Sequence, residues 1–325
     1  MPHEKINIIV TSAGTASAIS VIKALKSQTE IPVHIIAVDL DPMAAGLFLA
    51  DEYKLVPAAN DPSYIQTLID IGIQTGASVL IPIYSKEISI IARHEQQLKQ
   101  AGLLTFLPTP ETIDRCNNKK VMYAFAKEAG LNVPRVYEQY EITALSETDF
   151  PVFVKPNSGS SSAGAEKVLS KERLIELVNT GRELVIQQFI DAEEVTVDVF
   201  CNAKSEAIVI APRLRLATKS GQSVKGRTLS AQLFEKDVKN ICSQLHLIGA
   251  CNIQFFMTAD TLYFIEVNPR FAAGGLMLTV GAGANIPLLL LKTLQSMDIA
   301  DNECQTKPDF MMTRYWEEII FEYKK

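Results

Sequence analysis

Apolar and polar positions follow two different patterns along this chain of 325 residues. In the first hundred residues, short runs rich in β-branched side chains predict strands at 6–10, 33–38 and 79–83. A polar break follows the second run, and segments of helical periodicity predict helices at 16–26, 63–75 and 86–100. Strands that alternate with helices in this way are typical of a parallel sheet covered by helices.

Beyond residue 133 the pattern becomes that of hairpins. Apolar runs separated by turn residues predict mainly antiparallel strands at 150–154, 166–169, 184–189, 194–201, 207–211, 250–257 and 262–267. The polar, glycine-containing stretch 217–228 is expected to be a loop, and helices are expected at 171–179, 231–245 and 286–295. Two prolines before a helical segment at 111–130 indicate a domain boundary near residue 108.

Composition narrows the classes of protein. The chain is 47% apolar and 21% charged, with a formal net charge of −6, which excludes a disordered chain and argues against a nucleic-acid partner. Its five cysteines are at least nine residues apart without a CxxC motif, which indicates free thiols in a reducing compartment. The N-terminus does not resemble a signal peptide, and no apolar run approaches the roughly 18 residues of a spanning helix. We therefore expect a cytoplasmic protein with small-molecule partners and no membrane partner.

One segment combines a lysine with a loop of small residues. Residues 152–154 are an apolar strand that ends at Lys155, and small residues up to Gly164 separate it from a second strand near Glu166. Exposed backbone N–H groups in such a loop bind anionic oxygens, and a nearby ammonium adds a point charge. The segment therefore predicts a phosphate-binding flap, and the alternative is a flexible hairpin tip with one solvated lysine.

A second segment predicts a metal site. The strands at 250–257 and 262–267 are expected to pair, which would project Gln254, Glu266 and Asn268 from adjacent strands. Oxygen ligands of this kind suit Mg²⁺, which keeps waters and substrate phosphates as its other ligands. A glutamate on an apolar strand is also costly to bury without a cation. The alternative is that the Asn-Pro sequence is only a turn at a strand end.

Two further segments offer polar groups for ligands. An apolar strand ends in a bend at 188–190, whose backbone can pair with a base edge, and Glu194 can accept hydrogen bonds from ribose hydroxyls. Arg213 and Arg215 alternate onto one strand face, which suits a carboxylate or a carbonyl phosphate. The alternatives are an ordinary hairpin and two arginines solvated on an edge strand.

The order of these segments resembles the ATP-grasp superfamily, in the branch that includes the carbamoyl phosphate synthetase large subunit, biotin carboxylase and D-alanine–D-alanine ligase. The resemblance spans roughly 111–295, and the sequence Ile-Glu-Val-Asn-Pro-Arg is close to the carbamoyl phosphate synthetase form of the metal motif. It implies a Rossmann-like parallel-sheet domain at 1–108, a small ATP-grasp subdomain with the flap at 109–186, and a second subdomain with the metal and substrate site at 187–325. The expected fold class is thus α/β followed by α+β, with ATP between two subdomains.

The resemblance also assigns roles. It places Lys119 and Lys155 on ATP, Glu194 on the ribose and Arg270 on the transferred phosphoryl group, with Lys155 and Arg270 as the catalytic residues. Gln254, Glu266 and Asn268 would hold one or two Mg²⁺ ions, which Mn²⁺ can replace. The flap over the phosphates would include Asn157, Ser158, Gly159, Ser160 and Gly164. The adenine hinge would be formed by Gln188, Phe189 and Ile190.

Some residues depart from the family pattern or extend it. Asn118 stands where the family often has aspartate, and Gln188 where a glutamate is common. The substrate is expected to contact Arg213 and Arg215, together with Gly274 and Gly275, where small residues permit close backbone approach; these glycines could equally form only a turn. The four histidines lie outside the motifs, and no Ser-His-Asp or Cys-His arrangement is evident.

The predicted function is an ATP- and Mg²⁺-dependent ligase that joins a small carboxylate to an amine or related nucleophile through an acyl phosphate. Two alternatives remain, namely one component of a split carbamoyl phosphate synthetase and a non-catalytic ATP-binding module. A homodimer is a further expectation. The Arg-Tyr-Trp sequence at 314–316 is expected to form a buried or interface aromatic patch.

Overall fold

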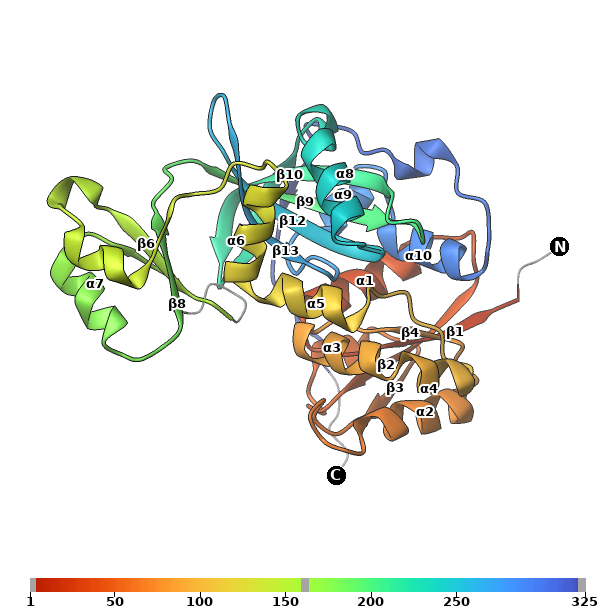
Figure 1. Cartoon of the computed structure of the whole chain (residues 1–325). Helices are drawn as coiled ribbons and strands as arrows, with labels where there is room; N and C mark the ends of the chain where they lie inside the picture. The colour runs from red at the N-terminus through yellow and green to blue at the C-terminus, as the bar shows by residue number, and fades with distance from the viewer. Residues whose placement is uncertain (1–3, 159–163, 321–325) are drawn as a thin grey trace.

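The computed structural model describes residues 4–158 and 164–320 (Figure 1). A four-stranded parallel sheet in the order β3-β2-β1-β4 forms the N-terminal domain, as predicted. Its strands are β1 (Ile6–Val10), β2 (Val33–Asp39), β3 (Glu52–Leu55) and β4 (Val79–Ile81).

Helices cover both faces of this sheet because β1, β2 and β4 are buried on both sides, whereas the edge strand β3 is half exposed. Ile8 lies in the core cluster of α1 (Ala16–Ser27), whereas Ile9 lies in the cluster of the helices on the other face. Those helices are α2 (Tyr64–Thr75), α3 (Ser85–Arg93) and α4 (Glu95–Gln100). The polar break after β2 contains a short 3₁₀ turn, Ala45–Phe48, and the strand β3, which the sequence pattern did not predict.

A small antiparallel sheet in the order β5-β8-β6-β7 follows the N-terminal domain. It forms a lobe with α7 that stands apart from the rest of the chain (Figure 1). Its strands are β5 (Val136–Tyr137), β6 (Val152–Pro156), β7 (Glu166–Val168) and β8 (Leu184–Gln188). Its helical elements are α7 (Lys171–Val178) and the 3₁₀ turns Gln139–Ala144 and Glu147–Asp149, and the helices that precede it are α5 (Pro110–Asn117) and α6 (Lys119–Glu128).

The third sheet is a six-stranded antiparallel sheet in the order β13-β12-β9-β10-β11-β14. Its strands are β9 (Glu193–Cys201), β10 (Ala207–Lys219), β11 (Gln222–Thr228), β12 (Gly249–Met257), β13 (Leu262–Asn268) and β14 (Met311–Thr313). The accompanying helical elements are α8 (Glu235–Gln244), α9 (Leu276–Gly281), α10 (Ile286–Leu294) and the 3₁₀ turns Ala231–Leu233 and Asp301–Cys304. Leucines of α10 share a core cluster with α1, so this part of the chain returns to the N-terminal domain.

Several sequence predictions about elements were wrong. The expected loop 217–228 is the end of β10 and the strand β11, because its backbone pairs with β10 and β14 and the hydroxyl of Ser223 accepts from Arg213. Three predicted helices are interrupted: 86–100 at His94, 111–130 at Asn118, and 231–245 by a 3₁₀ turn at its start.

The aromatic pair near the C-terminus is exposed. Tyr315 is 77% and Trp316 is 81% exposed, so the predicted burial of this patch within the chain was wrong. The Nζ atom of Lys219 lies 5.0 Å from the ring centroid of Trp316, which places this segment beside the β10–β11 hairpin. Among the described helices, none has both the length and the apolar character that a bilayer span requires.

Candidate active site

A cleft between the small sheet and the six-stranded sheet collects most of the residues that the sequence singled out. The small sheet and α6 contribute Lys119, Lys155 and Ser158 to its lining. The six-stranded sheet and the segment after it contribute Glu194, Arg213, Arg215, Gln254, Glu266, Asn268, Arg270 and Gly274. Lys155 and Glu266, which are distant in sequence, therefore face the same cleft.

Lys155 is a buried cation held by a short chain of hydrogen bonds. It is 6% exposed, and its Nζ donates to the hydroxyl of Tyr123 at 2.8 Å, which in turn donates to the Oε1 of Gln187 at 2.7 Å. Burial lowers the pKa of Lys155 to about 8, while the carboxylates of Glu266 and Glu194 oppose that shift. An anion in the cleft would favour the charged form of this lysine. The sequence analysis missed Tyr123 and Gln187, because their contact with Lys155 depends on how α6 packs on the small sheet.

The end of β6 is tied to the start of α6 by Asn157. Its backbone oxygen accepts from the backbone N–H of Lys119 at 3.3 Å, and its side-chain oxygen accepts from the backbone N–H of Lys120 at 3.0 Å. Asn118 caps α6 by accepting from the N–H of Val121 at 3.2 Å, a role that asparagine and aspartate share. Both residues therefore position Lys119 beside Lys155.

The remaining flap residues are only partly described. Ser158 lines the cleft, and Gly164 has a φ of +77°, in the left-handed region that favours glycine. The predicted flap residues Gly159 and Ser160 lie outside the described residues.

Oxygen-bearing side chains gather on the paired strands β12 and β13. Gln254 lies directly opposite Glu266, and Asn252 lies opposite Asn268. The Nδ2 of Asn268 donates to Glu266 at 2.9 Å and to the Oδ1 of Asn252 at 3.3 Å. All four side chains line the cleft, and one carboxylate with three amide oxygens fits the ligand preference of Mg²⁺. The sequence analysis missed Asn252, which the alternation of β12 from Gln254 could have indicated.

Arg270 connects this strand pair to the N-terminal domain. Its Nε donates to the hydroxyl of Ser85, at the start of α3, at 2.7 Å, and its Nη2 donates to the Oδ1 of Asn268 at 3.4 Å. Burial lowers the pKa of Arg270, and Glu266 opposes the shift, but the guanidinium remains charged at neutral pH. The site thus includes a contact across 185 positions of sequence, and Ser85 carried no sequence signal.

Both arginines that were predicted to contact the substrate have carboxylate partners. Arg213 is 3% exposed and makes a bidentate ion pair with Asp198, with both N–O distances at 3.1 Å. Arg215 forms an ion pair with Glu194 and donates to the backbone oxygen of Gly221 at 2.7 Å. Because β10 is an interior strand, the alternative of two solvated arginines on an edge was wrong.

Gly274 and Gly275 allow close packing against β10 and β11. A Cβ atom on Gly275 would lie 2.0 Å from the Cζ of Arg213, and one on Gly274 would lie 2.5 Å from the backbone nitrogen of Ser223. The close backbone approach at these glycines is to Arg213 and Ser223, and their contact with a substrate stays a prediction.

The predicted hinge residues do not line the cleft. The backbone N–H of Gln188 donates to the backbone oxygen of Arg135 at 2.8 Å. The Nζ atom of Lys167 lies 4.0 Å from the ring centroid of Phe189. Within the described residues, the lining contributed by β8 is Gln187, whereas Gln188, Phe189 and Ile190 are absent from it.

A second cavity, of about 460 Å³, lies at the carboxyl ends of the parallel strands. Its lining includes Asp39 and Tyr84 and the buried carboxylate of Glu87, which accepts from the hydroxyls of Ser12 at 3.0 Å and Tyr64 at 2.8 Å. Tyr84 and Glu87 flank Ser85, so this cavity adjoins the contact with Arg270.

Comparisons with known proteins agree with this architecture. A family described as an ATP-grasp domain matches residues 116–274, and one described as a PylC-like N-terminal domain matches residues 8–106. The carbamoyl phosphate synthase large chain of Corynebacterium glutamicum is 27% identical over 210 residues, which are 58% of this chain and 19% of that protein. The match thus spans about a fifth of that relative's length.

Solved structures share the fold at low identity. The biotin carboxylase domain of 2-oxoglutarate carboxylase from Hydrogenobacter thermophilus, in complex with MgADP, ADP and bicarbonate, has a TM-score of 0.71 at 16% identity and covers 91% of this chain and 71% of its own. An L-amino acid ligase from Bacillus licheniformis has a TM-score of 0.67 at 17% identity and covers 94% of this chain and 78% of its own.

The fold and the cleft define a protein in which two α+β subdomains follow a parallel α/β domain. Residues 116–274 carry a single ATP-grasp domain, which follows a PylC-like N-terminal domain at residues 8–106. The resemblance to ATP-grasp proteins and the fold class, both predicted from the sequence, are confirmed. Proteins of the ATP-grasp family bind ATP and Mg²⁺.

Proposed function

We propose that this chain is an ATP- and Mg²⁺-dependent ligase that activates a small carboxylate as an acyl phosphate and transfers it to an amine or related nucleophile. The observation that carries the proposal is that Lys155 faces the same cleft as Glu266 and Asn268. A buried cation and oxygen ligands for a metal ion are what a triphosphate requires, and phosphoryl transfer asks for positioning and charge neutralisation.

In the proposed complex, Lys119 and Lys155 contact the phosphates, and the flap from Asn157 to Gly164 covers them. The adenine hinge at Gln188 to Ile190 stays part of the proposal; because these residues lie outside the lining of the cleft and the N–H of Gln188 donates to Arg135, the backbone of Phe189 and Ile190 would have to reach the adenine beyond the cavity. Glu194 accepts from the ribose, with Arg215 holding its carboxylate in place.

Glu266, Asn268 and Gln254 would hold one or two Mg²⁺ ions, with Asn252 orienting Asn268 through their hydrogen bond. The ion, when bound, neutralises phosphate oxygens, and Mn²⁺ can take its place. The catalytic roles fall to Arg270, beside the phosphoryl group in transfer, and to Lys155.

The proposed reaction has two steps. A carboxylate oxygen attacks the γ-phosphorus of ATP, the bond from that phosphorus to the β–γ bridging oxygen breaks, and ADP leaves. The amine then attacks the carbonyl carbon, loses a proton, and inorganic phosphate leaves as the amide forms. Lys155 and Arg270 supply positive charge for the phosphoryl oxygens in the first step.

The substrate side of the proposal rests on the cleft wall formed by β10 and the segment after β13. Arg215 and the backbone at Gly274 line the cleft, while Gly275 supports Arg213, which is engaged with Asp198. We propose that the nucleophile approaches from the cavity beside Ser85, where the carboxylate of Asp39 suits an amine; the carboxylate of Glu87 is buried and already accepts from Ser12 and Tyr64.

The proposed partners are small molecules only, without nucleic acid or a membrane. A homodimer remains part of the proposal, and the 2-oxoglutarate carboxylase domain is described as a dimer. Sedimentation velocity at several concentrations would test it, and a single monomeric species throughout would contradict it. The boundaries at 108 and 186 also remain proposals.

The test of the function is a screen of carboxylates paired with amines, read by ADP formation. We expect ADP only with a productive pair, in equal amount to phosphate and to the amide detected by mass spectrometry. Tight ATP binding without substrate-dependent ADP formation across a broad screen would contradict the proposal and favour a non-catalytic ATP-binding module.

One component of a split carbamoyl phosphate synthetase is a second candidate, because the curated relative reported above is the large chain of that enzyme. The same screen distinguishes the carboxylate ligase from the carbamoyl phosphate synthetase component when bicarbonate and ammonia are included among the substrates. ATP hydrolysis that depends on bicarbonate alone would favour this candidate. Absence of that activity, with candidate partner chains also added, would exclude it.

The lowered pKa of Lys155 predicts how ATP binding depends on pH. Burial holds this pKa at about 8 in the free protein, so the ammonium loses its proton as the pH rises above that value. Bound phosphate favours the charged form and raises the pKa, so the affinity for ATP is expected to fall by up to about tenfold per pH unit above pH 8. Calorimetry between about pH 7 and pH 10 measures this.

The matched control is Lys155→Arg, because a guanidinium stays protonated throughout this range. Its affinity is expected to be independent of pH. An equally steep fall in this variant would show that another group titrates.

A further inference from the structure

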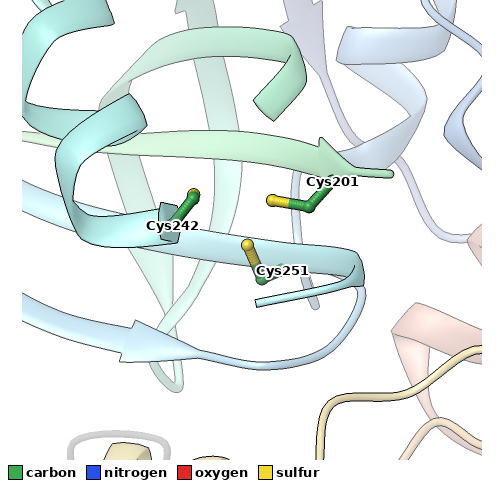
Figure 2. A group of neighbouring side chains, drawn as sticks. All are labelled: Cys201, Cys242 and Cys251. Carbon is green, nitrogen blue, oxygen red and sulfur yellow. The ribbon is translucent and has the colours of Figure 1, made fainter. Parts of the chain in front are cut away.

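Three cysteines that are separate in the sequence lie close together between β9, α8 and β12 (Figure 2). Cys201 ends β9, Cys242 lies in the last turn of α8, and Cys251 lies near the start of β12. Their sulfur atoms all lie within 4.8 Å of one another. The sequence spacing gave no metal motif, since the fold alone brings the three elements together.

The surroundings of this cluster are apolar. Cys201 and Cys242 are 0% exposed and Cys251 is 2% exposed, and all three belong to the core cluster beneath α8. Hydrogen bonds from the Cys242 and Cys251 thiols lower the pKa of Cys201, and the hydrogen bonds to Cys201 raise the pKa of the other two. The side chains that act on these thiols are other cysteines, and among the described residues no cation is counted with them.

The number of ligands limits what the cluster can bind. Within the described part of the chain, the group of candidate ligands consists of these three thiols without a fourth member. A structural zinc ion takes four protein ligands, and hard cations prefer oxygen. Sulfur atoms about 2.3 Å from a common centre lie about 4 Å apart when the centre is planar and closer when it is pyramidal, so the three sulfur atoms would have to move inward. A thiophilic element that takes three sulfur ligands therefore fits this cluster.

The net charge of the bound complex distinguishes between the thiophilic elements that could occupy the cluster. Three thiolates on a divalent ion leave one negative charge, which is costly in an apolar core without a counter-charge. A trivalent centre with three thiolates is neutral. The cluster thus favours a trivalent, thiophilic element with three-fold coordination, of which arsenic(III) is the accessible example.

We propose that Cys201, Cys242 and Cys251 form a binding site for a trivalent thiophilic metalloid, with arsenic(III) as the probe. Arsenous acid would react with the three thiols to form three As–S bonds; each thiol proton joins a hydroxyl group, and three water molecules leave. No electron is transferred in this reaction. The site is independent of the ATP cleft, because Cys251 and the cleft-lining Asn252 are neighbours on a strand and point to opposite faces.

The test is native mass spectrometry of the full, reduced chain with arsenite in the absence of air. We expect one arsenic atom per chain with the loss of three protons. Cys242→Ser is expected to weaken binding by at least about tenfold, because the loss of a ligand costs no less than the loss of a supporting contact. Cys304→Ser is the matched control, since Cys304 is a half-buried thiol outside the cluster, and it is expected to bind as the unaltered chain does.

A second measurement on the unaltered chain keeps the test decisive if Cys242→Ser fails to fold. X-ray absorption at the arsenic edge is expected to count three sulfur neighbours. Two sulfur neighbours, loss of binding in Cys304→Ser, or no adduct at all would overturn the proposal, and the last result would mean that the thiols only pack the core.

Discussion

Glu266→Gln is expected to lower the rate of substrate-dependent ADP formation by about 10²–10³-fold, the usual effect of removing one preorganised electrostatic group. Glu266 is the carboxylate among the four oxygen-bearing side chains of β12 and β13 in the cleft. The amide keeps the shape of the side chain, so the change removes charge from the metal ligands while the fold should persist. Steady-state ADP formation with a productive substrate pair measures the effect.

The same change should also move the pH dependence of ATP binding. Glu266 opposes the lowering of the Lys155 pKa, so the loss of its charge is expected to take that pKa below about 8. The affinity for ATP would then begin to fall at a lower pH than in the unaltered chain. Calorimetric titration of both chains across this range distinguishes an electrostatic effect from a general loss of structure.

Glu193→Gln is the matched control for this experiment. Glu193 lies at the start of β9 and is exposed, outside the lining of the cleft. Its substitution is expected to leave ADP formation and the pH dependence unchanged. If Glu266→Gln kept full activity, the assignment of the metal site to β12 and β13 would be wrong.

Arg213→Met is expected to reduce the free energy of unfolding by about 3–5 kcal/mol, because it would leave the buried carboxylate of Asp198 without its ion-pair partner. Asp198 is 2% exposed, and its remaining hydrogen-bond donor is the hydroxyl of Thr279 at 2.6 Å. The hydroxyl of Ser223 would also lose the donor that now reaches it at 3.3 Å. Urea titration followed by circular dichroism measures the change.

Two further variants test the cause. Arg227→Met breaks an exposed ion pair with Asp309, whose side chains are 44% and 77% exposed, and is expected to cost less than about 1 kcal/mol. Asp198→Leu combined with Arg213→Met removes both buried charges and should recover much of the loss. A double variant as unstable as Arg213→Met alone would show that packing, rather than the unpaired charge, accounts for the effect.

The parts of the site that could be predicted are those in which one short segment contains the chemistry. The strand that ends at Lys155 and the strand that contains Glu266 and Asn268 each stand out as polar groups in an apolar run. Strand alternation then places Glu266 and Asn268 on one face, as the structure has them. The parallel sheet was predictable for the same reason, since its strands and helices alternate visibly along the chain.

The strand β11 could not be predicted, because its residues are polar and become buried only when they are paired. Ser223 is 3% exposed beside Arg213, a residue that would itself be unfavourable in the core without Asp198. A sequence pattern records the polarity of a residue and not the partner that compensates it.

The sequence by itself determined the resemblance to the family, the alternation of strands and helices in the N-terminal domain, and the lysine and glutamate that face the cleft, because each depends on local periodicity and on side-chain chemistry. The tertiary structure alone decided the contact of Arg270 with Ser85, the ion pair of Arg213 with Asp198 and the cluster of three thiols. Those features join residues from separate elements, and their energies depend on burial and distance, which exist only once the chain has folded.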